Sequence, residues 1–173
     1  TTMGYKRSGS DDYININNGL TYINANHYIV GAEYRPDDNT KISVEGFYKT
    51  YNDYPFSVID QVSLASKGGD YGTFGDEEVT PTSSGNAKGL EVLFRKQTEG
   101  GTSLITAYTF VRSSFTDANN ELIPSSWDSK HILTATLSQK LKRNWTAGFK
   151  WRFVGGLPYT PNDFDKSSLV QAW

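Results

Sequence analysis

The chain has 173 residues, a length that fits one domain or part of a larger one. Its 17 lysine and arginine residues against 19 aspartate and glutamate residues give a formal charge of −2, which argues against a nucleic-acid-binding protein. The absence of cysteine excludes disulfide frameworks, Cys-ligated zinc and thiol catalysis, and two histidines are too few for a multi-histidine metal site. No apolar run approaches the ~18 residues of a membrane helix, a test that does not apply to the alternating strands of a membrane β-barrel.

Alternation of apolar and polar residues, rather than helical periodicity, runs through the chain and predicts six β-strands. The predicted strands are 26–35, 41–51, 87–96, 102–112, 130–139 and 144–154. On these strands 23 positions of one parity carry no charge; they are Tyr28, Val30, Ala32, Tyr34, Ile42, Val44, Gly46, Tyr48, Leu90, Val92, Phe94, Leu104, Thr106, Tyr108, Phe110, Leu133, Ala135, Leu137, Trp145, Ala147, Phe149, Trp151 and Phe153. The opposite parity carries Glu33, Arg35, Lys41, Glu45, Lys49, Glu91, Arg95, Lys150 and Arg152. One face of the predicted sheet therefore suits an apolar medium and the other suits water, although Ile105, Ala107 and Val111 make the second face of strand 102–112 apolar as well.

The connections between the predicted strands alternate between short and long. The short ones are Pro36–Asn39, Gln97–Gly101 and Lys140–Arg143, and the long ones are 52–86, 113–129 and the stretch from Gly155 onward. Because each hairpin reverses the chain, all short turns fall at one end of the sheet and all long loops at the other. This asymmetry is typical of outer-membrane barrels. The pattern predicts an all-β fold of consecutive antiparallel hairpins, and a soluble sandwich, which alternates in the same way, is the alternative.

Aromatic residues of the apolar parity gather near the two ends of the predicted strands. Tyr34, Phe94 and Trp145 lie next to the short turns, and Tyr28, Tyr48, Phe110 and Phe153 lie near the long loops. Two such rows match the aromatic girdles at the two interfaces of a membrane. The general preference of aromatic residues for strands is the alternative explanation.

Several stretches resemble, in their order and spacing, the late β-barrel of a TonB-dependent outer-membrane receptor of the Bacteroidetes type. These stretches are His27–Pro36, Ser43–Lys49, Tyr51–Pro55, Ala87–Glu91, Leu93–Lys96, Ala107–Phe110, Pro124–Asp128 and Gly155–Pro161. Together they cover about residues 26–161. The resemblance implies a transmembrane barrel of about 22 strands with short periplasmic turns and long extracellular loops.

The resemblance also implies a function, a location and partners. Such a receptor imports a bulky nutrient (an iron chelate, cobalamin, a glycan or a peptide) across the bacterial cell outer membrane. Its partners are outer-membrane lipid, its own plug domain, TonB and a surface lipoprotein, with no nucleic acid among them. Neither a plug nor a TonB-contacting segment is recognisable here, so residues 1–173 are expected to be a fragment of the barrel domain. The alternative is a soluble β-rich binding module at the bacterial surface, for instance for glycans.

Patterns that carry chemistry are sparse. We find no paired carboxylates, Ser-His-Asp set or zinc-hydrolase motif, and therefore predict no catalytic residue, no metal site, no cofactor and no enzymatic activity. Asp117, Asn119 and Glu121 alternate oxygen ligands along a loop, but they lack the central glycine and distal glutamate of a calcium loop.

The candidate binding residues are aromatic side chains of the predicted long loops. They are Tyr54, Phe56, Tyr71, Phe74 and Trp127. Aromatic side chains on loops held by a rigid scaffold stack on sugars or on apolar parts of ligands. The alternative is that they pack the loops against one another.

Overall fold

The computed structural model describes residues 5–7, 13–67 and 77–159. Its strands are β1 (Tyr5–Arg7), β2 (Tyr13–Asn15), β3 (Asn24–Asp37), β4 (Thr40–Ser57), β5 (Val79–Gln97), β6 (Thr102–Thr116), β7 (Leu122–Pro124), β8 (Lys130–Lys140) and β9 (Thr146–Val154). Two short 3₁₀ turns, η1 (Leu64–Ser66) and η2 (Lys142–Asn144), complete the secondary structure of this part of the chain. Within it, no helix has the length and apolar character needed to cross a membrane.

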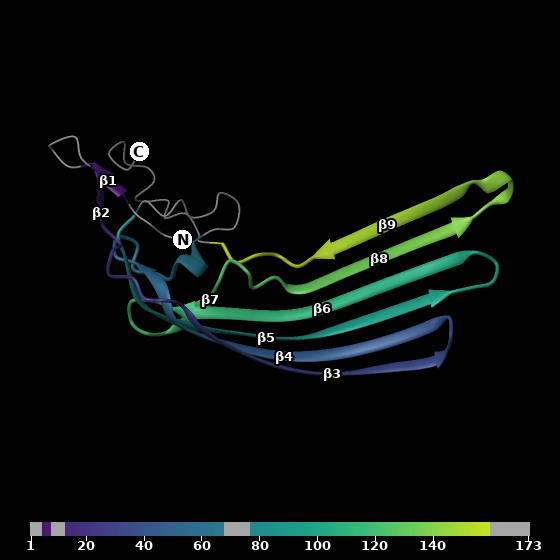
Figure 1. Cartoon of the computed structure of the whole chain (residues 1–173), viewed down its shortest axis with the longest axis horizontal. Helices are drawn as coiled ribbons and strands as arrows, with labels where there is room; N and C mark the ends of the chain where they lie inside the picture. The colour runs from purple at the N-terminus through teal and green to yellow at the C-terminus, as the bar shows by residue number, and fades with distance from the viewer. Residues whose placement is uncertain (1–4, 8–12, 68–76, 160–173) are drawn as a thin grey trace.

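The long strands form one antiparallel sheet whose neighbours follow the order of the sequence. The sheet has seven strands in the order β3-β4-β5-β6-β8-β9, with β7 paired to β6, while β1 and β2 pair separately. The turns β3–β4, β5–β6 and β8–β9 all lie at one end, on the right of Figure 1. This arrangement confirms the predicted all-β fold of consecutive antiparallel hairpins, and it brings the longer connections together at the opposite end.

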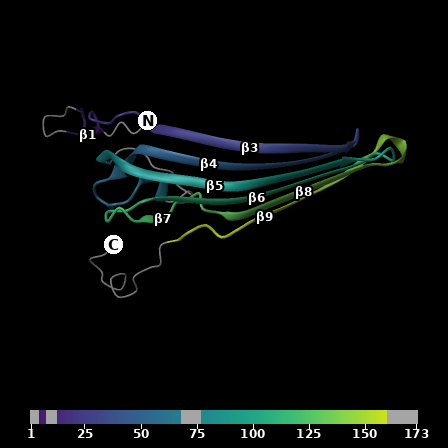
Figure 2. The same ribbon diagram turned by 90° about the horizontal axis from the view of Figure 1, so that it is seen from below.

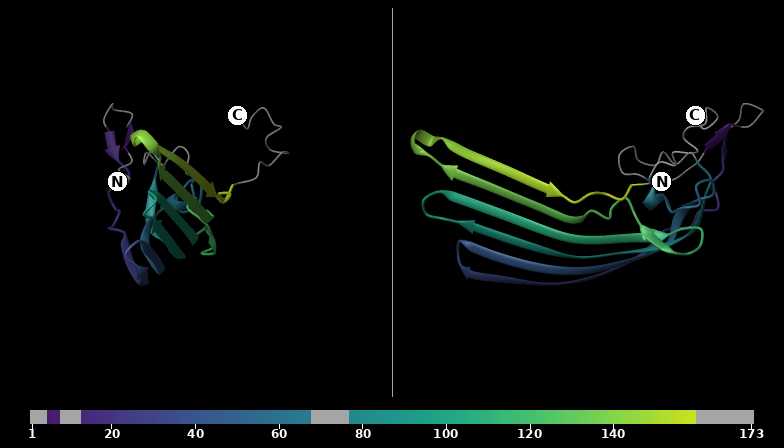
Figure 3. Two further views of the ribbon diagram at one scale, coloured as in Figure 1. Left: turned by 90° about the vertical axis from the view of Figure 1, so that its right-hand side faces the viewer. Right: turned by 180° about the vertical axis from the view of Figure 1, so that it is seen from behind.

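The strands lie side by side in a single curved layer. Figure 2 shows the sheet from below, and the end view in Figure 3 shows the layer curving from β3 to β9. Among the described strands, β3 and β9 each have one hydrogen-bonded neighbour, so both present an open edge.

The strands β3 to β6 extend beyond their predicted ends, and in β4 this corrects the assignment of two aromatic residues to a loop. β4 continues past residue 51 to Ser57, and β5 begins at Val79 rather than near residue 87. Tyr54 and Phe56 therefore lie on β4, paired with Ser83 and Thr80. The physical reason is that the β4–β5 register shifts between Tyr51 and Tyr54 and again between Tyr54 and Phe56. Such bulges interrupt the period-2 alternation on which the sequence assignment rests.

The pairing register places the predicted apolar positions directly opposite one another. One row runs across the whole sheet through Ala32, Val44, Val92, Tyr108, Leu133 and Phe153. The adjacent row on the other face runs through Glu33, Ser43, Leu93, Ala107, Thr134 and Arg152. We call the first face the apolar face and the second the charged face. A slip of one residue in any pairing would mix them.

The buried apolar core sits at the end of the sheet that carries the longer connections. Leu64, Ala65, Val79 and Phe115 are the buried apolar side chains of the described residues. In contrast, the apolar face is open: Val30 is 77% exposed and Phe149 is 63% exposed. A soluble sandwich would cover such a face with a second sheet, and the described part of the chain supplies no second layer against it.

Candidate ligand-binding cavity

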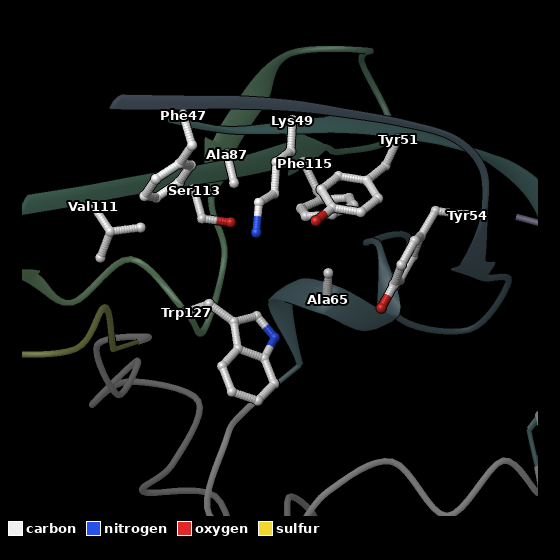
Figure 4. A pocket seen from close by; sticks show the side chains of 10 residues that line it. All are labelled: Phe47, Lys49, Tyr51, Tyr54, Ala65, Ala87, Val111, Ser113, Phe115 and Trp127. Atoms are coloured by element: carbon white, nitrogen blue, oxygen red, sulfur yellow. The ribbon is translucent and has the colours of Figure 1, made fainter. Parts of the chain in front are cut away.

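A cavity of about 380 Å³ lies on the charged face, at the end of the sheet where the longer connections meet. Its lining comes from β4, β5, β6, η1 and the segment before β8, and comprises Phe47, Lys49, Tyr51, Tyr54, Ala65, Ala87, Val111, Ser113, Phe115 and Trp127. Figure 4 shows these side chains converging on a common space. Two of the predicted candidates, Tyr54 and Trp127, belong to this lining.

The other predicted candidates do not join them. Phe56 lines a separate, more polar hollow with Asp117 and Asn119. Tyr71 and Phe74 lie outside the described residues. In the separate hollow, the Asp117 carboxylate accepts hydrogen bonds from the backbone N–H groups of Asn119 and Glu121, each at 2.9 Å. Asp117 thus stabilises a turn, and the described residues contain no group of three or more potential metal ligands.

Aromatic rings form one wall of the cavity. The rings of Tyr51 and Phe115 are stacked, with centroids 5.6 Å apart, and the Tyr54 ring approaches Phe115 at 4.8 Å. Phe115 is buried, and the backbone of β5 comes close to it at Gly85, where an added Cβ would lie 2.4 Å from the ring. The glycine is therefore what allows this wall to pack directly against the sheet.

Two connections fold over the charged face and close the cavity on its far side. The η1 turn and the segment containing Trp127 are joined at Ser126, whose N–H and hydroxyl both donate to the carbonyl of Ala65, at 3.0 and 2.8 Å. Ser63 caps η1, because its hydroxyl oxygen accepts a hydrogen bond from the Ala65 N–H. These bonds hold Ala65 and Trp127 at fixed positions across from the sheet.

The position of Trp127 depends on its neighbour Asp128, which is fully buried. One carboxylate oxygen of Asp128 accepts hydrogen bonds from the Arg112 guanidinium and from the Ser113 N–H, each at 2.9 Å. The pairing with Arg112 offsets part of the cost of burying this carboxylate, whose other oxygen, Oδ2, is buried without a hydrogen-bond partner among the described residues. The result is that the turn before β8 is anchored to β6, while the Trp127 side chain itself stays 66% exposed.

A second charged network lies behind η1. Lys67 forms ion pairs with Asp60 and with Glu77, and the Ser57 hydroxyl donates to Glu77 at 2.5 Å. Burial alone would lower the pKa of the Lys67 ammonium, but the hydrogen bonds that Lys67 donates to Asp60 and Glu77 outweigh it and raise that pKa above its usual value. The pKa of the Tyr54 hydroxyl, which lies beyond the predicted strand 41–51, is also raised, chiefly by burial. At neutral pH Lys67 is thus charged and Tyr54 is a neutral phenol.

Among the described residues that line the cavity, Lys49 is the one cation. Its ammonium lies 5.1 Å from the centre of the Phe47 ring, a cation–π contact, and Figure 4 shows it pointing into the cavity. Sequence reasoning missed Phe47, Lys49, Tyr51 and Phe115 as site residues. It had placed the first three on the strand 41–51 and Phe115 in the long connection 113–129, although Phe115 lies on β6. The alternation that assigns a residue to the charged face does not tell which part of that face a distant loop will cover.

The described residues that form the lining offer aromatic rings, hydroxyl groups and one ammonium, which are groups that can bind a ligand. No family model, no curated protein and no solved structure matches the chain. The residues and their geometry therefore carry the functional argument.

Proposed function

We propose that the chain forms consecutive strands of an outer-membrane β-barrel belonging to a TonB-dependent receptor, and takes part in the active import of a bulky nutrient. The observation that carries this proposal is the two-faced single layer: an exposed apolar face without charge in its middle rows, backed by a charged face. In water the apolar face would be costly to leave open. In a bilayer it would meet lipid, while the charged face lined a wet interior.

The dimensions of the apolar face support the proposal. On β5 this face is bounded by Lys88 and Lys96, and Leu90, Val92 and Phe94 lie between them. Eight residues of strand span about 27 Å. At the usual barrel tilt of about 40° this corresponds to a height of about 21 Å, close to the ~25 Å apolar band of outer-membrane barrels.

The aromatic residues of the apolar face lie toward both ends of the strands. Toward the longer connections Tyr28 pairs with Tyr48, and Phe110 and Phe153 lie on rows progressively farther from that end. At the other end, Tyr34 and Phe94 share one row through Ile42, and Trp145 directly precedes β9. The drift of these rows from strand to strand suits strands that cross a membrane at a tilt, with the aromatic side chains at its two interfaces.

The open edges of β3 and β9 also support a larger barrel. Each is a row of backbone N–H and C=O groups that pairs on one side only among the described strands. Such groups cost several kcal/mol each in hydrocarbon, so membrane-spanning sheets are closed. Further strands of the same barrel would satisfy both edges.

The cavity supports a receptor role because it lies on the charged face and beside the longer connections, where a solute from outside the cell would arrive. The same aromatic cavity also suits the alternative function, a surface module that binds glycans. That alternative leaves the exposed rows of the apolar face facing water.

Epitope insertion tests the proposed topology. One epitope is placed between Asn119 and Asn120, in the β6–β7 turn, and another at Asp38, in the β3–β4 turn, each in the full reading frame. We expect antibodies to label the first on intact cells and the second only after the outer membrane is permeabilised. Labelling of both epitopes on intact cells would refute the barrel and favour the surface module.

A further inference from the structure

The ammonium of Lys49 is the charge in the cavity that the described protein does not neutralise. Two other cations at this end of the sheet are paired: Lys67 with Asp60 and Glu77, and Arg112 with Asp128. Lys49 has no carboxylate within ion-pair distance in the described ranges, and its ammonium makes a cation–π contact with the face of Phe47.

Two carboxylates of the charged face, Glu45 and Glu91, lie well along the strands from Lys49 and form no ion pair with it. Glu45 lies four residues before Lys49 on β4, and Glu91 lies four residues after Ala87, the cross-strand partner of Lys49. Four residues of strand span about 13 Å. Both glutamates therefore lie nearer to the short turns than the cavity does, and neither of them lines it.

We propose that this cavity binds a carboxylate carried on a six-membered ring, with the carboxylate paired to Lys49 and the ring held against the aromatic side chains. This inference rests on the proposed function, because the ligand must reach the charged face from outside the cell. A volume of about 380 Å³ is near the lower limit of ligand pockets, so the cavity takes one end of a bulky nutrient rather than the whole.

The side chains that line the cavity indicate why the ligand should carry a ring. Figure 4 shows Trp127 across the cavity from the strand residues, with the Lys49 ammonium between them. The Trp127 side chain is largely exposed, and Tyr51 and Tyr54 bring hydroxyl groups to the opposite side. A flat aromatic ring or the apolar face of a sugar ring can stack on the indole while hydroxyl groups of the ligand bond to the tyrosines.

The loss of water from the Lys49 ammonium on ligand binding indicates why the ligand should carry a carboxylate. A ligand that fills the cavity removes water from the Lys49 ammonium, and burying an unpaired charge is costly. A neutral ring leaves that charge without a partner and a cationic ring repels it, whereas a carboxylate replaces the lost water with a charge-assisted hydrogen bond. Lys49 therefore selects for negative charge.

Saturation-transfer NMR on the full receptor in detergent micelles tests the inference. Benzoate, benzyl alcohol and benzylamine form one series, and glucuronate and glucose form a second, so that the two series separate an aromatic acid from a uronic acid. We expect the carboxylate of at least one series to bind about tenfold more tightly than its neutral counterpart, the ratio that corresponds to about 1.4 kcal/mol.

Variants assign the preference to Lys49. Lys49→Met should abolish the preference for the carboxylate, and Lys49→Arg should retain it. Lys41→Met is the matched control, because Lys41 lies on the same face of β4 but at the far end, where it pairs with Glu33, and its loss should leave binding unchanged. A receptor that binds acid and neutral probes equally, or a folded Lys49→Met variant that keeps the preference, would overturn the inference.

The two proposals can fail separately. Probe binding in micelles does not depend on which end of the sheet faces outward, so a failed epitope experiment would remove the transport role and leave the ligand class standing. If the epitopes show the expected topology but the probes show no preference for carboxylates, the transport role stands and the proposed ligand class is refuted.

Discussion

An arginine in the middle of the apolar face should destabilise the folded barrel far more than one on the charged face. Ala135 is the central residue of β8, five residues from Lys130 and five from Lys140, and it is flanked by Thr106 and Trp151. Five residues extend about 17 Å along the strand, or about 13 Å in height at a 40° tilt, half of the ~25 Å apolar band. Ala135 therefore sits at the expected midplane, where arginine costs about 2–4 kcal/mol.

Ala107→Arg is the matched control. Ala107 is also an alanine of intermediate burial in the middle of a long strand, but it lies on the charged face between Leu93 and Thr134. We expect its replacement to change the free energy of unfolding by less than about 1 kcal/mol, as for most solvated positions.

The assay is urea unfolding of the full receptor in phospholipid vesicles, followed by tryptophan fluorescence, with Val92→Arg as a second variant on the apolar face. Equal losses for Ala135→Arg and Ala107→Arg, or a larger loss for Ala107→Arg, would show that the apolar face does not meet hydrocarbon.

Three further predictions concern the edges, the cavity wall and the network behind it. The 173-residue chain by itself should associate in water and give no conductance in planar bilayers, because β3 and β9 have open edges; a monodisperse monomer by light scattering would contradict the barrel. Gly85→Ala should cost about 1–3 kcal/mol, since its Cβ would collide with the Phe115 ring, whereas at Gly46 the nearest atom is 4.0 Å away and the same change should be nearly neutral in urea unfolding. Lys67→Gln should destabilise the fold at neutral pH. Because the pKa of Lys67 is raised in the folded state, its contribution is present at neutral pH and up to the ordinary lysine value of 10.5 and is lost as pH rises through the raised pKa, so the two unfolding curves should converge at high pH.

The faces and the pairing of the sheet could be predicted from sequence because they follow from one local rule. Alternation assigns each residue to a face, and short turns such as Gln97–Gly101 then leave little freedom in the register. Val92 is opposite Val44 and Tyr108 for this reason.

The ends of the strands and the cavity could not be predicted in the same way. Asp53 adopts a positive φ of 55° within β4, and the register shifts by bulges on both sides of it. Because these bulges break the alternation and the residues are typical of a turn, the sequence pattern does not show that the strand continues. The cavity depends on contacts between distant segments, such as the hydrogen bonds from Ser126 to Ala65, which no local pattern encodes. The sequence also could not show that Lys49 lacks an ion-pair partner among the described residues, because this depends on which carboxylates pair with Lys67 and Arg112.

The contact between the apolar face and lipid can be measured residue by residue, because the chain contains no cysteine and single cysteines can be introduced without background. Nitroxide labels at positions 133 to 137 of β8, in the full receptor in bilayers, report their access to oxygen from the lipid and to a nickel complex from water. The account predicts strict alternation: oxygen relaxes the labels at Leu133, Ala135 and Leu137, and nickel relaxes those at Thr134 and Thr136. Equal access of the nickel complex to all five positions would contradict it.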